Sequence, residues 1–94
     1  MIGVYASFTV KEGKQQEVEA LISQFEQESR THVGCISYQC GKVSGSERDY
    51  AFIERWASQQ DLDAHLAHPF FVENAPTLVA LTDGLDIKVV NFER

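Results

Sequence analysis

The sequence has few basic residues and no long apolar run, and each shortage excludes a class of protein. Eight lysines and arginines stand against fourteen acidic residues, for a net charge of -6. Nucleic-acid binders and proteins that dock on anionic membranes normally carry a basic patch, so we expect neither partner. No apolar stretch approaches the roughly 20 residues that span a bilayer. No basic segment precedes an apolar run at the start, as a signal peptide would require.

The sequence is also poor in cysteine and lacks the common cofactor motifs. Cys35 and Cys40 lie on one predicted strand at a spacing that predicts opposite faces, so we expect free thiols and a reducing, cytoplasmic location. Residues 41–45 lack the spacing of a glycine-rich phosphate loop. Neither a Gly-x-Ser-x-Gly elbow nor a Cys-x-x-Cys pair occurs. We therefore expect no bound cofactor.

Hydrophobic periodicity divides the chain into strands and helices. In chain order, the pattern predicts a strand over 2–10, a helix over 15–30, strands over 35–43 and 50–57, a helix from a Ser58 cap to His68, a second helical segment from Pro69, and a strand over 85–92. We expect Pro76 to kink or interrupt the last helical segment. We expect Asp83-Gly84 to form a turn.

This β-α-β-β-α-β order predicts an α+β, ferredoxin-like subunit with an antiparallel sheet, and residues 1–94 are predicted to form a single domain. All helices then cover one face of the sheet. The strands are nevertheless apolar on both sides, since Tyr5 alternates with Val4 and Ile53 with Phe52. A second copy of the chain is the predicted cover for the other face, which gives a homodimer with sheets packed face to face.

Groups capable of acid–base chemistry gather where strand 50–57 passes into the next helix. Glu54 shares a strand face with Phe52 and Trp56, so it is either a proton acceptor with a raised pKa or a structural partner of Arg55, Arg48 or a backbone group. His65 is either a general base or ligand hydrogen-bond donor, or a half-buried structural imidazole. The aromatic side chains fill the core or line a pocket for a flat organic molecule.

A metal site is a further interpretation of the same segment. His65 and His68 share a helix face at i and i+3, and His32 or Glu54 would complete the site. Capping of the helix that begins at Pro69 is the simpler role for His68. We therefore predict no metal.

The chain resembles the antibiotic biosynthesis monooxygenase family along essentially its whole length, and within it the short bacterial quinol monooxygenase-like proteins. The residues that carry the resemblance are Gly34-Cys35-Ile36-x-Tyr38, Phe52-x-Glu54-x-Trp56-x-Ser58 and Leu62-x-Ala64-His65-Leu66-x-x-Pro69-x-Phe71. The spacing from Glu-x-Trp-x-Ser to His-Leu is its most specific part.

The resemblance implies a dimeric α+β barrel of ferredoxin-like subunits. It also implies oxidation of hydroquinones or anthrones by molecular oxygen without metal or flavin, in which the protein removes a proton, stabilises the anion and excludes water. We predict His65 and Glu54 as catalytic residues. The predicted substrate-binding residues are Trp56, Tyr38, Phe52, His68 and Phe71.

Two other functions stay open at this point. One is a non-catalytic dimeric module that binds a small aromatic metabolite, and the other is an isomerase that uses His65 and Glu54 as acid and base. Haem-degrading members resemble this chain less, because Ser7, His65 and Ala75 stand where those members use Asn, Trp and His.

Overall fold

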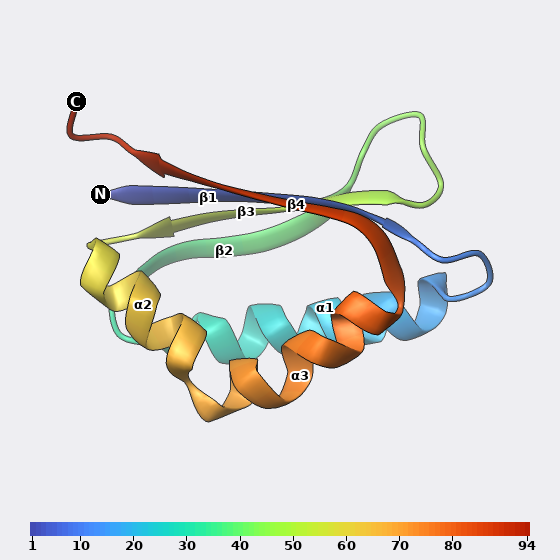
Figure 1. Ribbon diagram of the computed structural model, residues 1–94, viewed down its shortest axis with the longest axis horizontal. Coiled ribbons are helices and arrows are strands. Elements are labelled where there is room, and N and C mark those ends of the chain that lie inside the picture. Colours follow the sequence, from blue (N-terminus) through green and yellow to red (C-terminus); the bar gives the residue numbers. More distant parts are fainter.

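The computed structural model describes residues 1–94, and four strands and three helices follow one another along the chain (Figure 1). The elements are β1 (Ile2–Val10), α1 (Gln15–Ser29), β2 (Cys35–Lys42), β3 (Asp49–Trp56), α2 (Gln59–Ala67), α3 (Pro69–Ala80) and β4 (Thr82–Asn91). The strands form one antiparallel sheet in the order β2-β3-β1-β4. All three helices lie on the same side of this sheet (Figure 1). The predicted ferredoxin-like α+β arrangement is confirmed.

The core fills the space between the sheet and the helices. Strand β1 buries every second residue from Ile2 to Val10, which is the alternation expected of a strand with one apolar face. Strand β3 buries Tyr50, Phe52, Glu54 and Trp56 in the same way. A carboxylate therefore lies on the buried side of the sheet, among aromatic side chains.

The two short helices begin at the predicted caps. The Ser58 hydroxyl accepts a hydrogen bond from the Asp61 backbone N–H at 3.1 Å, and His68 Nδ1 accepts one from the Phe70 backbone N–H at 3.1 Å. The expected interruption at Pro76 does not occur: α3 continues through Pro76 to Ala80. Pro76 removes only one backbone donor, and Phe71, Ala75 and Leu78 pack the helix against the core on both sides of it.

The prediction that Cys35 and Cys40 face opposite sides of the sheet is wrong. Cys35 pairs with Trp56 and Ser37 pairs with Arg55, so one extra residue, Ile36, interrupts the alternation of β2. Such a bulge reverses the faces of the residues before it relative to those after it. Both free cysteines accordingly pack against the core.

The predicted turn at Asp83-Gly84 is also wrong, because β4 already begins at Thr82. Ser7 pairs with Asp86 and Thr9 with Asp83, so β4 contains one more residue than β1 over this stretch. Gly84 has a φ of 64°, a conformation that glycine adopts without strain in a bulge. Gly84 thus bends the strand rather than ending it.

The side of the sheet away from the helices is uncovered (Figure 1). Four large hydrophobic side chains on β1, β3, β4 and the residue after β4 remain between 43% and 52% exposed. They are Tyr5, Ile53, Val90 and Phe92, and we call this surface the open face. No helix of the structure is both long and apolar enough to cross a membrane.

Candidate functional site

An apolar groove of about 130 Å³ lies between the sheet and the three helices. Fourteen of its sixteen lining residues are hydrophobic, including Phe25, Tyr38, Phe52 and Phe71. The two exceptions are Glu54 from β3 and His65 from α2. A dry cavity of ~150 Å³ is known to hold a benzene molecule, so the groove has room for one aromatic ring.

Glu54 is an acid in an environment that disfavours its charge. Its side chain is only 6% exposed, and Oε1 accepts a hydrogen bond from Trp56 Nε1 at 3.0 Å. Burial raises the pKa of the Glu54 carboxyl to about 7, because the loss of solvation outweighs the opposing effect of the Trp56 hydrogen bond. Near neutral pH this carboxyl therefore exists in both protonation states and can exchange a proton.

His65 is a neutral imidazole for a related reason. It is 2% exposed, and burial, then the neighbouring His32 and His68, lower its pKa to about 4. Its ring lies 4.5 Å from the Trp56 ring and 5.1 Å from that of Phe71, between centroids. His65 Nδ1 is 2.9 Å from His32 Nδ1, whereas Nε2 has no partner within the chain and is not sealed from solvent. One ring nitrogen is thus available to a ligand.

The predicted site residues divide into two groups. Glu54, His65, Tyr38, Phe52 and Phe71 line the groove. Burial, followed by the charge of Glu54, raises the pKa of the Tyr38 hydroxyl far above its usual range, so Tyr38 stays protonated.

Trp56 and His68 do not line the groove. Trp56 is completely buried beside Glu54 and His65 and supports both side chains. His68 caps α3 and lies in a second, more polar depression of about 270 Å³, together with His32 and one side of His65. The sequence predicts substrate contact for these two residues, but their positions suit them to hold other groups in place.

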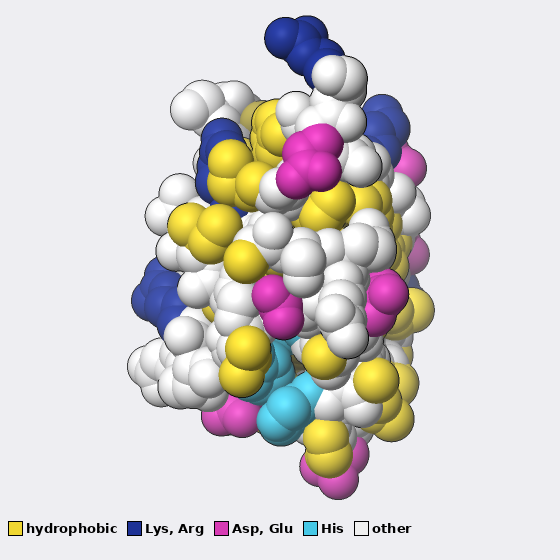
Figure 2. Space-filling view, turned by 90° about the vertical axis from the view of Figure 1, so that its left-hand side faces the viewer, with side chains coloured by type: hydrophobic (Ala, Val, Ile, Leu, Met, Phe, Trp, Pro, Cys, Tyr) yellow, Lys and Arg dark blue, Asp and Glu magenta, His cyan; other side chains and the backbone are white.

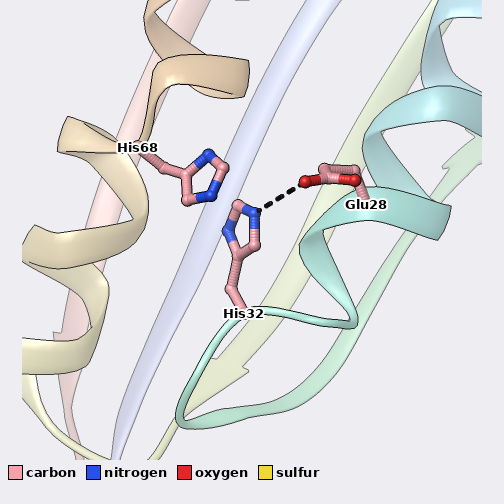
Figure 3. A group of neighbouring side chains, drawn as sticks. All are labelled: Glu28, His32 and His68. Atoms are coloured by element: carbon pink, nitrogen blue, oxygen red, sulfur yellow. Dashed lines mark ion pairs between the residues drawn. The ribbon is translucent and has the colours of Figure 1, made fainter.

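Three histidines meet at the end of the molecule that carries α2. Figure 2 shows histidine side chains gathered there among hydrophobic and acidic ones. The His32 ring stacks on His68 at 4.0 Å between centroids, and His32 Nε2 lies 3.5 Å from Glu28 Oε1 (Figure 3). The sequence placed His32 beside His65 only within the metal interpretation, and it did not predict their hydrogen-bonding contact or the role of Glu28. The only signal was the i, i+4 spacing of Glu28 and His32 at the end of the first helix.

Glu28, His32 and His68 each have a possible metal-ligand atom within 4.8 Å of the others. This set differs from the sequence-based one, which centred on His65. The arrangement fits a metal poorly: the two imidazole planes are 26° apart and stacked, so their in-plane lone pairs do not converge. His68 Nδ1 is moreover engaged by the Phe70 N–H. The cluster is better described as a hydrogen-bonding group than as a metal site.

The chain has the same fold as several solved structures. A conserved protein of Methanosarcina mazei is 27% identical, with a TM-score of 0.92 over 96% of this chain and 90% of the other. A second structure is a variant of SnoaB of Streptomyces nogalater, which is described as a cofactor-independent oxygenase. SnoaB is 18% identical to this chain, with a TM-score of 0.87 over 99% of this chain and 93% of SnoaB.

Sequence comparison gives the family. An uncharacterized protein of Synechocystis is 35% identical over 82 residues, an alignment that covers 84% of this chain. The alignment spans only 56% of that relative's length. The family model described as antibiotic biosynthesis monooxygenase matches residues 1–74, most of the chain. With the fold and these matches together, the chain belongs to the antibiotic biosynthesis monooxygenase family.

Proposed function

We propose that this protein is a monooxygenase that oxidises a small reduced aromatic compound of the hydroquinone or anthrone type with molecular oxygen and without a bound cofactor. One observation carries the proposal: the two lining residues of the groove that are not hydrophobic are Glu54, whose pKa is about 7, and His65, whose neutral ring has a nitrogen able to accept a proton. The family and the shared fold with a cofactor-independent oxygenase support the same reaction class.

The size of the groove favours a hydroquinone over a larger anthrone. Its volume of about 130 Å³ suits one ring, and the aromatic side chains among its lining residues offer stacking and edge contacts. The rim is formed by Leu85, Ile87 and Val89 of β4, which are 42% to 56% exposed. A substituent on the ring would leave the groove across this apolar rim.

The chemistry requires little from the protein beyond proton transfer and exclusion of water. Glu54 or His65 takes a phenolic proton, and the electron-rich anion then reduces oxygen. For a hydroquinone, the ring gives up four electrons. One oxygen atom enters the ring to give a hydroxyquinone, and the other leaves as water with the two hydrogens that the ring system loses. A dry groove protects the anion from protonation by bulk water during these steps.

The test is oxygen consumption by metal-stripped protein with a panel of reduced quinones and anthrones, compared with the spontaneous rate. Glu54→Gln and His65→Gln each remove a proton acceptor, and we expect either change to lower turnover about a hundredfold or more. Asp63→Asn, an exposed change on α2, is the control that keeps wild-type turnover. Isotope-labelled dioxygen should place one labelled atom in the product and one in water. No uptake with any compound would contradict the proposal.

An isomerase is a second candidate, because two groups that exchange protons border one cavity and need no oxygen to move a proton within a bound metabolite. It predicts product under argon. Ligand binding without any product, in air or under argon, would instead indicate a non-catalytic binding module.

We further propose that the working form is a homodimer in the reducing cytoplasm. The open face exposes four large hydrophobic side chains on a sheet surface, and such a surface is normally covered. A second copy with its sheet packed on the first covers both faces by one symmetric contact. The two unpaired cysteines suit a reducing compartment.

A further inference from the structure

A continuous line of polar groups connects the groove with the surface. His65 Nδ1 lies 2.9 Å from His32 Nδ1. Figure 3 shows the next contact, in which His32 Nε2 lies 3.5 Å from Glu28 Oε1. The His32 side chain is only 7% exposed, and its Nε2 has no hydrogen bond of standard geometry, so the Glu28 carboxylate is its charged neighbour. Glu28 is 41% exposed and reaches solvent.

The carboxylate at one end determines which ring nitrogens carry hydrogen. An ionised carboxylate only accepts hydrogen bonds, so it favours a hydrogen on His32 Nε2. A neutral His32 then has a lone pair on Nδ1, and the short contact requires His65 Nδ1 to donate. His65 Nε2 is left with a lone pair, and it is the nitrogen without a partner in the chain.

We propose that Glu28 and His32 are positioning residues that hold His65 in the tautomer with a basic Nε2 and relay the substrate's proton from the groove to solvent. This inference rests on the proposed function for the identity of the proton donor, a substrate hydroxyl. The tautomer itself is a property of the resting protein and does not depend on any activity.

The surroundings of His65 explain why a relay is needed. The titratable groups around it are Tyr38 from β2, Glu54 from β3, His32 after α1, His68 between α2 and α3, and Asp61, which lies one turn earlier on α2 and lines the same polar depression. Tyr38 and the histidines supply no negative charge, Glu54 is itself partly protonated near neutral pH, and Asp61 is not among the groups that shift the pKa of His65. A lasting imidazolium at His65 is therefore costly, and burial lowers its pKa accordingly.

A relay avoids that charge. His65 Nε2 accepts the proton of the substrate hydroxyl while Nδ1 gives its own proton to His32 Nδ1. His32 in turn releases the proton on Nε2 to Glu28 and solvent. Each imidazole ends neutral, in the opposite tautomer, and the substrate is left as its anion. The reverse transfer returns a proton to the reduced oxygen when water leaves, and this restores both tautomers.

The first experiment is NMR of the imidazole nitrogens in chelator-treated protein without substrate. We expect His65 Nδ1 to carry hydrogen and Nε2 to be unprotonated. Glu28→Lys places a donor where the acceptor was, and we expect it to invert both tautomers, so that His65 Nε2 carries hydrogen. Glu17→Lys makes the same charge change on an exposed residue of α1 away from the cluster and should leave the spectrum unchanged. A wild-type His65 protonated on Nε2, or no change in Glu28→Lys, would overturn the relay.

The second experiment measures turnover. Glu28→Gln and His32→Ala should lower kcat about tenfold or more with little change in KM, and added imidazole should partly restore the His32→Ala variant. If wild-type turnover depends on His65 but not on Glu28 or His32, the relay fails and the proposed function stands. If no compound is turned over but the tautomers and their inversion are as expected, the proposed function fails and the orienting role remains. Tight zinc binding by His32 and His68 would assign the cluster to a metal and overturn the relay.

Discussion

Gly34 lies directly against Asp61 of α2, and a β-carbon on Gly34 would overlap the Asp61 side chain. The Gly34 carbonyl also accepts a hydrogen bond from the Ala57 N–H at 2.8 Å. Gly34 has a φ of 80°, which only glycine adopts readily. This close approach packs the loop after α1 onto the start of α2, and so brings His32 within reach of His65.

Replacement of Gly34 by alanine should therefore destabilise the protein more than the backbone angle alone requires. Gly13 has the same φ of 80°, but no atom lies within 4 Å of the position that a β-carbon would take there, so Gly13→Ala is the matched control. We expect about 1 kcal/mol of destabilisation for Gly13→Ala and at least about 2 kcal/mol for Gly34→Ala, measured by urea denaturation. Equal losses of stability in the two variants would show that the contact with Asp61 does not contribute to the cost of a side chain at Gly34.

Glu54 should make the protein less stable as pH rises. Its pKa is about 7 in the folded protein, against an ordinary value of 4.5, so between these values the folded state keeps a proton that the unfolded chain releases. Stability is then lost as pH increases through this window. Glu54→Gln removes the effect. We expect the difference in free energy of unfolding, variant minus wild type, to increase by roughly 2–3 kcal/mol as pH rises from about 4 to 8. A pH-independent difference would contradict the raised pKa.

His65 should make the protein less stable as pH falls, which is the opposite of the effect of Glu54. Its pKa is about 4 in the folded protein, against an ordinary value of 6.5, so in this window the unfolded chain binds a proton that the folded protein excludes. Stability is then lost as pH falls from 6.5 to about 4. The two effects largely cancel in the wild type. In Glu54→Gln only the His65 effect remains, so we expect this variant to lose stability as pH falls. In His65→Gln only the Glu54 effect remains, so we expect that variant to lose stability as pH rises. Denaturant titration across the pH range measures both.

Occupation of the groove should depend on the free space beside α3. Ala75→Phe introduces a ring into the groove, and we expect it to weaken binding of hydroquinone under argon at least about tenfold. Val72→Phe adds the same ring type on the exposed side of α3, where the native side chain is 58% exposed, and should leave affinity unchanged. Quenching of tryptophan emission provides the measurement. Equal affinities would show that the ligand binds elsewhere.

The open face should determine the oligomeric state. Ile53→Glu places a charge at the centre of this face, opposite Tyr5 in the sheet, and we expect it to convert a dimer into a monomer in size-exclusion chromatography with light scattering. Val33→Glu makes a similar change at a loop residue that is 82% exposed and should remain dimeric. A wild-type monomer at micromolar concentration would refute the proposed assembly.

Much of the fold was predictable because its signals are local. The alternation of β1 and β3 and the caps at Ser58 and His68 each depend on residues adjacent in the chain. The bulges at Ile36 and Gly84 were missed, since a single extra residue leaves the overall hydrophobic pattern almost unchanged.

The site was predictable only in part. Glu54 stands out because a carboxylate on an apolar strand face is unusual, and that anomaly is visible in sequence. The contact between His32 and His65 joins residues 33 positions apart, and it depends on the conformation of Gly34 and its packing against Asp61. Hydrophobic periodicity carries no information about such a contact.

The position of Trp56 has a spectroscopic consequence. It is the single tryptophan of the chain, it is fully buried, and its indole N–H points at a carboxyl that changes charge near neutral pH. The transition energy of an indole responds to nearby charge, so its emission maximum reports the ionisation of Glu54. A plain fluorescence titration of the unlabelled protein therefore follows the charge state of the groove, before and after a ligand enters.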